Sequence, residues 1–166
     1  LRPELNLKES LAKSIRFLWN FAHPDGSFGG VYGSRGTRFY FPAGLELMKE
    51  EIPEARALAD FMRRSISSHS TVTLDTMDEP NLIPMFNSYC LAAEVFKENL
   101  DSSPTIPCNE EKLNLRHFPK AGFVVHGDSD TYTVISTNKG GVCYHFTKEP
   151  NLSAFISAER FGSFVK

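Results

Sequence analysis

The hydrophobic spacing of this chain changes once along its length, and that change constrains the fold more than any other feature. Before residue 100, apolar residues recur at intervals of three and four, which is the spacing of one face of a helix. After a polar break at 102–107, apolar and polar residues alternate, as they do along a half-buried strand. The sequence therefore predicts an α+β fold with a helical part over 1–103 and an antiparallel β part over 104–166, each burying its own apolar surface.

Two helices are expected early in the helical part, over residues 7–22 and 43–64. The first follows Asn6 and Glu9, whose three-residue separation is typical of a capping box. Pro53 should break or kink the second helix, because proline cannot donate the backbone hydrogen bond that a helix interior requires.

A third helix is expected over residues 81–97. Cys90 falls on its apolar stripe and is expected to be a small buried hydrophobe rather than a nucleophile. The side predicted to be buried carries Leu82, Met85, Phe86, Tyr89, Ala93 and Phe96.

The β part contains three strand-like runs, at 123–126, 131–136 and 142–146. Turn-forming residues separate them at 127–130 and 138–141, so they predict consecutive antiparallel strands, a meander at the edge of a sandwich-type sheet. Such a sheet needs a second layer over its apolar face, and little of the chain remains to supply it. The chain is therefore expected to be a fragment of a longer protein.

Charge and cysteine content exclude several classes of function. The 18 basic and 20 acidic residues leave a formal charge of -2, so no attraction to nucleic acid or to anionic membranes is expected. No apolar run reaches the roughly 18 residues that a membrane helix needs, and a soluble protein is predicted. The three cysteines form no CxxC pair, so neither a disulfide framework nor a metal site is expected, and no cofactor is implied. Localisation is left open.

The most informative stretch is the loop expected at 23–42, which combines glycines, aromatic residues and two arginines. A helix precedes it, so its glycines are not a dinucleotide-binding fingerprint. Aromatic rings suit the C–H faces of sugars and arginine forks bind carboxylates, which together favour an acidic carbohydrate as ligand. The alternative is structural: the aromatics plug the end of a helical barrel and the arginines bind helix C-terminal carbonyls.

Within this loop the candidate residues for proton transfer are Tyr32 and its neighbour Arg35, because a nearby guanidinium stabilises a phenolate. Candidates for binding substrate are Arg38, Tyr40 and Phe28.

The other polar side chains that could take part in a site can also be interpreted without a catalytic or binding role. His23 and His69 could each add an imidazole, although a loop histidine often has no function. The acids Asp75, Asp78 and Glu79 are interpreted as helix-capping residues rather than as a glycosidase pair or a metal cluster.

Asp-Gly-Ser-Phe-Gly-Gly at 25–30, between helices, resembles the connections of the α/α-toroid scaffold shared by terpenoid cyclases, protein prenyltransferases and several polysaccharide lyases. The β segments at 121–125 and 135–142 follow the helices, and this order resembles the heparinase II/III type of polysaccharide lyase rather than the cyclases. The resemblance implies an incomplete α/α toroid followed by a β-sandwich.

In that lyase class a tyrosine commonly acts as acid or base, while histidine, asparagine or arginine neutralises the uronate carboxylate during β-elimination. Carried onto this chain by loop position, the resemblance implies Tyr32 as acid or base, with Arg35 and His23 as neutralisers. The expected function is therefore that of a carbohydrate-active protein, a lyase of an acidic polysaccharide. The alternative is a noncatalytic glycan-binding or scaffold protein with a toroid fold.

Overall fold

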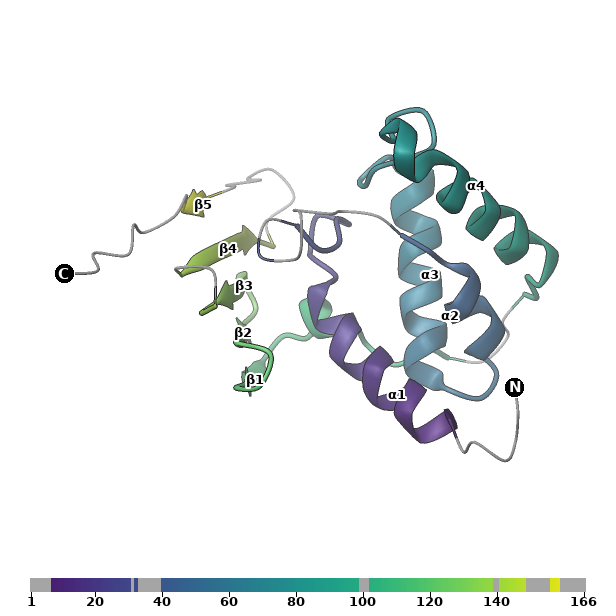
Figure 1. The fold of residues 1–166 in the computed structure, drawn as a ribbon. Helices are drawn as coiled ribbons and strands as arrows, with labels where there is room; N and C mark the ends of the chain where they lie inside the picture. The colour runs from purple at the N-terminus through teal and green to yellow at the C-terminus, as the bar shows by residue number, and fades with distance from the viewer. Residues whose placement is uncertain are drawn as a thin grey trace.

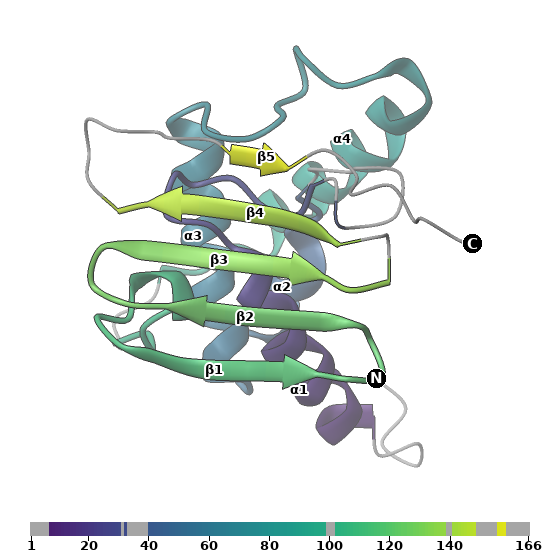
Figure 2. The ribbon, with the colours of Figure 1, turned by 90° about the vertical axis from the view of Figure 1, so that its left-hand side faces the viewer.

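A computed structural model describes residues 7–30, 32, 40–98, 102–138 and 141–148, together with the backbone of 156–158. Its strands form one sheet, and its helices lie together on one side of that sheet (Figure 1). In the view turned by 90°, the sheet faces the reader and the strands lie in front of α1, α2 and α3 (Figure 2). The α+β class predicted from the sequence is confirmed.

The helices begin and end close to the predicted positions. The predicted helix at 7–22 is α1, Leu7–Leu18, continued by one 3-10 turn, η2, Trp19–Phe21. The predicted helix at 43–64 is divided into α2, Ala43–Met48, and α3, Pro53–Ser67, with Pro53 in the first turn of α3, where its missing N–H costs nothing. The predicted helix at 81–97 is α4, Glu79–Glu94. A short 3-10 turn, η4, Pro107–Asn109, leads into the sheet.

The sheet is a five-stranded antiparallel meander with the order β1-β2-β3-β4-β5. Its strands are β1, Leu113–Phe118, β2, Phe123–Gly127, β3, Thr131–Ser136, β4, Val142–Thr147, and β5, Ile156–Ala158. The meander of β2, β3 and β4 was predicted, whereas β1 was not. Polar Asn114, Arg116 and His117 interrupt the apolar pattern of β1, and this edge strand is held by its pairing with β2.

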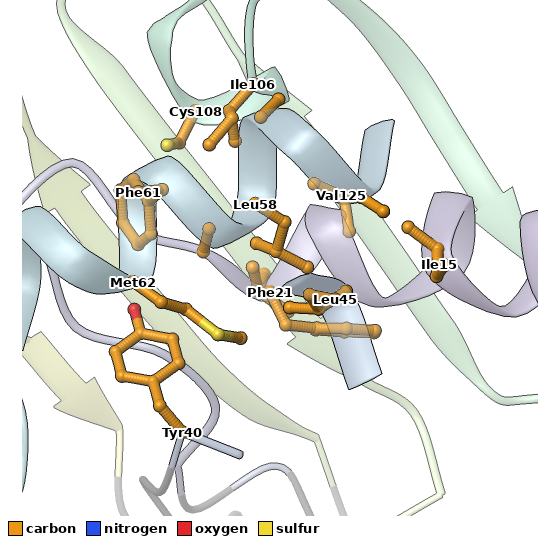
Figure 3. Packing of buried hydrophobic residues seen from close by; sticks show 14 of the residues in the cluster. Ile15, Phe21, Tyr40, Leu45, Leu58, Phe61, Met62, Ile106, Cys108 and Val125 are labelled. Carbon is orange, nitrogen blue, oxygen red and sulfur yellow. The ribbon is translucent and has the colours of Figure 1, made fainter. Parts of the chain in front are cut away.

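One hydrophobic core joins the helices to the sheet, so the expectation of separate apolar surfaces was wrong. Phe17 of α1 lies 5.1 Å from Phe118, and Phe21 lies 5.1 Å from Phe123, measured between ring centroids. Figure 3 shows Phe21 in the same cluster as Leu58 of α3 and Val125 of β2. The sheet buries one face, and the end of α1 covers that face. The domain boundary near residue 103 stays a prediction.

The predicted buried side of α4 was also wrong in large part. Met85 is fully buried, but Phe86 is 50% and Phe96 is 42% exposed, and Cys90 is exposed. α4 packs mainly against α2, and its apolar residues surround the helix instead of forming one stripe. Periodicity could not indicate which side faces the core.

Two glycines test how tightly the backbone constrains the fold. Gly122 precedes β2 with φ +68°, and an added Cβ would lie 2.3 Å from the Asn138 side chain. Gly122→Ala is expected to lower the free energy of unfolding by at least about 1 kcal/mol, because alanine is strained at positive φ. Gly44→Ala in α2 is the matched control. No heavy atom lies within 4 Å of its added Cβ, so it should raise stability by about 0.5–1 kcal/mol. Chemical denaturation measures the free energy of unfolding of both variants. Equal changes would contradict the strained, closely packed position assigned to Gly122.

Candidate functional site

The candidate site begins with a tight turn after η2. The backbone N–H of His23 donates to the Ser27 carbonyl at 2.9 Å, and the N–H of Gly26 donates to the His23 carbonyl at 3.0 Å. Gly26 has φ +85°, and an added Cβ would lie 2.7 Å from Cβ of Ser70. Only glycine lets the turn approach the end of α3 this closely.

Three hydrogen bonds link four side chains in a row from the surface to the core. Ser27 Oγ–H donates to Oδ1 of Asp25 at 2.6 Å, and Ser27 Oγ lies 2.8 Å from Nδ1 of His23. His23 Nε2 lies 2.6 Å from the Tyr32 hydroxyl. Because the Ser27 proton is directed to Asp25, Nδ1 of His23 carries the proton donated to Ser27, and Nε2 accepts from Tyr32. We call this row, Asp25, Ser27, His23 and Tyr32, the relay.

Aromatic rings of the sheet enclose the inner end of the relay. The His23 ring stacks on Phe146 with centroids 4.3 Å apart, and the Tyr32 ring lies 5.3 Å from Tyr144, edge to face. His23 is 0% and Tyr32 is 3% exposed. Gly30 allows this packing, since an added Cβ would lie 2.4 Å from the Tyr144 ring.

Burial sets the protonation state of Tyr32. Desolvation of the phenolate, with smaller contributions from neighbouring tyrosines, raises the pKa of Tyr32 well above the ordinary value of 10.0. The phenol is therefore protonated at neutral pH, and His23 Nε2 is positioned to accept its proton. Chemically, the relay holds the proton on Tyr32 and aligns it with Nε2 of His23. Because burial disfavours the charged phenolate, transfer of this proton to His23 requires a group that stabilises the phenolate.

The other predicted site residues are separate from the relay. Tyr40 is fully buried, and its hydroxyl donates to the Gly26 carbonyl at 3.0 Å. Its ring lies 5.1 Å from the partly buried Phe28, so both pack the loop against the helices. A packing role for the loop aromatics was part of the structural alternative, whereas the helical barrel that they would plug stays a prediction. Arg35 and Arg38 lie outside the described residues.

The predicted capping acids bind local partners. Asp78 is the N-cap residue of α4 but makes no side-chain cap bond, and its Oδ2 instead accepts from Nδ2 of Asn81 at 2.7 Å. Asp75 accepts the hydroxyl of Thr73, which lowers the pKa of this carboxyl below its usual range. Among the residues with described side chains, no group of three or more His, Cys, Asp or Glu could hold a metal ion.

Sequence reasoning missed the part of the site that depends on distant contacts. Asn20 is 1% exposed, and its amide donates to the Arg16 carbonyl at 2.8 Å, which caps the end of α1. Its own carbonyl accepts from the Tyr132 hydroxyl at 2.8 Å, and its Oδ1 accepts from Arg116 at 2.9 Å. An asparagine at a helix end signals a cap, but no local pattern pairs it with strands about 100 residues away.

No family model matches the chain. No solved structure matches it with statistical significance. No helix within the described ranges is long and apolar enough to cross a membrane.

The buried phenols predict a stability limit at high pH. Burial raises the pKa values of Tyr32, Tyr40 and Tyr132 above 10.0 in the folded chain. A raised folded pKa contributes stability that is complete below the unfolded value, near pH 10, and is lost as the pH rises further. The chain should therefore unfold cooperatively above about pH 10.

Tyrosinate absorbance and near-ultraviolet circular dichroism, followed together during an alkaline titration, check this. The two signals should change in one transition. Gradual ionisation of all tyrosines near pH 10, with native circular dichroism retained, would show that the phenols are not buried.

Proposed function

We propose that this protein is carbohydrate-active and cleaves an acidic polysaccharide by β-elimination, with Tyr32 as acid and base. The observation that carries the proposal is the 2.6 Å contact between the Tyr32 hydroxyl and His23 Nε2. The other imidazole nitrogen is supported by Ser27 and Asp25, so His23 is oriented to accept the phenolic proton. The resemblance of the 25–30 segment to the connections of toroid lyases suggests the substrate class.

The proposed steps return every proton to its starting point. His23 Nε2 takes the Tyr32 proton, and the phenolate removes the proton from C5 of a uronate unit. The bond between C4 and the glycosidic oxygen breaks as a C4=C5 double bond forms. The leaving oxygen takes the proton from Tyr32, and the imidazolium of His23 then restores Tyr32. No oxidant, reductant or other co-reactant is needed.

Neutralisation of the uronate carboxylate belongs to the same proposal. Arg35 is the proposed partner, since a guanidinium binds a carboxylate through two parallel hydrogen bonds. Arg38 is proposed to bind substrate nearby. A bound cation would lower the pKa of the C5 proton, which the phenolate must remove.

A second candidate function, noncatalytic glycan binding or a scaffold role, is favoured by the burial of the relay. The exposed fraction of Tyr32 is 3%, and Tyr144 and Phe146 cover the relay from the sheet. A substrate would reach the phenol only after this cover opens. If the cover does not open, the relay contributes stability alone.

The finer architecture is also part of the proposal: the helices belong to an α/α toroid and the sheet to a β-sandwich. The exposed apolar side chains of α4, including Ile83 at 63%, are of the kind that a neighbouring helical hairpin covers. A crystal structure of the full reading frame tests this, and solvent against α4 in that structure would overturn it.

Tyr32→Phe separates the two functions. In the lyase it should lower the rate of unsaturated uronide formation by at least about 100-fold, because the ring stays and only the hydroxyl that carries the proton is lost. The formation of unsaturated uronide is read as new ultraviolet absorbance from an acidic polysaccharide. Tyr89→Phe is the matched control, since the Tyr89 hydroxyl has no hydrogen-bond partner among the described residues. Unchanged turnover in Tyr32→Phe would remove Tyr32 from the mechanism, and wild-type glycan binding without product would favour the second candidate.

A further inference from the structure

A polar pocket of about 270 Å³ lies on the surface beside the relay. It is formed where the 25–27 turn meets the chain that follows α3. Its lining consists of hydroxyl side chains, one imidazole and one aliphatic side chain: Ser27, His69, Ser70, Thr71, Val72 and Thr76. Ser27 belongs to both the pocket and the relay, so the two features are adjacent.

The backbone at His69 is unusual for a residue with a side chain. α3 ends in a Schellman motif, in which the N–H of Ser70 donates to the Ser65 carbonyl at 2.9 Å and the N–H of His69 donates to the Ile66 carbonyl at 3.2 Å. His69 occupies the left-handed position of this motif, with φ +55°. Glycine is the usual residue there, because it carries no steric cost at positive φ.

Packing does not account for a histidine at this position. His69 is exposed, so its ring contributes little to the core. The left-handed backbone nevertheless places the imidazole among the residues that line the pocket. Strained residues persist where they serve a site, and here the strained residue and the pocket coincide.

The lining favours a neutral, hydroxylated ligand. The Ser27 hydroxyl already donates to Asp25 and the Thr76 hydroxyl to the Thr73 carbonyl, so each oxygen is oriented as an acceptor, which matches the donating hydroxyls of a sugar. No lysine or arginine is among the lining residues. The carboxylate of Asp25 accepts a hydrogen bond from Ser27, and Asp75 precedes the lining residue Thr76, so two negative charges lie beside the pocket and oppose an anion. Its volume lies near the lower limit for small-molecule sites, which suits one sugar ring.

We propose that this pocket binds a neutral sugar residue, with the imidazole of His69 packed on the sugar ring and the hydroxyl oxygens of Ser27 and Thr76 accepting hydrogen bonds from sugar hydroxyls. This inference rests on the proposed function in that the ligand is taken to be a glycan. It adds a subsite for a neutral unit, next to the position proposed for the uronate.

Ligand-observed NMR with the whole chain tests the site, with N-acetylglucosamine as the neutral probe and glucuronate as the acidic one. N-acetylglucosamine should bind in the millimolar range and glucuronate more weakly. His69→Gly should lower the affinity for N-acetylglucosamine at least tenfold while raising the thermal midpoint, since glycine relieves the left-handed strain. His126→Ala removes another exposed histidine, on β2, and should leave the affinity unchanged.

Three results would overturn the inference: no binding of N-acetylglucosamine, tighter binding of glucuronate, or an unchanged affinity in His69→Gly. The higher thermal midpoint shows that the His69→Gly variant is folded, so a lost affinity cannot be attributed to unfolding. The uronide assay is independent of this experiment. If unsaturated uronide forms but N-acetylglucosamine does not bind, only the proposed sugar pocket is contradicted. If N-acetylglucosamine binds but no unsaturated uronide forms, only the proposed lyase activity is contradicted.

Discussion

The rest of the structure depends on one contact. The end of α1 and the turn that follows it pack against the inner face of the sheet and cover it. A meander with one apolar face is unstable until another layer buries that face. Phe17 and Phe21 contact Phe118 and Phe123 at the β1–β2 end of the sheet. The His23 ring continues the same layer onto β4. The turn that carries the candidate site is therefore part of the core.

Placing a histidine in an aromatic core requires that both of its ring nitrogens be satisfied. An unpaired buried polar group costs about 1–3 kcal/mol, so the Tyr32 and Ser27 contacts of His23 stabilise the fold whatever their role in chemistry. The chain of bonds ends at Asp25, which is exposed, so its charge keeps its hydration. The same geometry that avoids a buried charge also forms a directed path for a proton. Stability and the proposed chemistry thus use the same atoms.

The sequence predicted what depends on neighbours along the chain. Pro53 divided the second helical segment as expected, and the turn at 127–130 correctly joined β2 to β3. Features that depend on distant contacts were not predictable. β1 is held by its pairing with β2, and Met85 alone is buried on α4 because of where α2 lies.

The candidate site also has a part that the local sequence predicts and a part that depends on distant contacts. Tyr32 and His23 were selected for their chemistry and their position in a glycine-rich loop, and they do contact each other. Their enclosure by Tyr144 and Phe146 depends on residues more than 100 positions away. Ser27 lies only four residues from His23 and could have been considered, since turns bring such side chains together. Tyr40 and Phe28 show that aromatic residues in a loop also serve packing.

Ser27 connects the relay to the proposed sugar pocket through the hydrogen-bonding capacity of its single oxygen. Its proton is donated to Asp25 and one lone pair accepts from His23, which leaves one lone pair for a ligand. A sugar hydroxyl that donates to this remaining lone pair would draw electron density from the oxygen and so weaken the hydrogen bond that the oxygen accepts from Nδ1. The basicity of Nε2 would then fall, and Tyr32 would hold its proton more firmly. A filled pocket would thus favour the acid form of Tyr32, the form that protonates a leaving glycosidic oxygen.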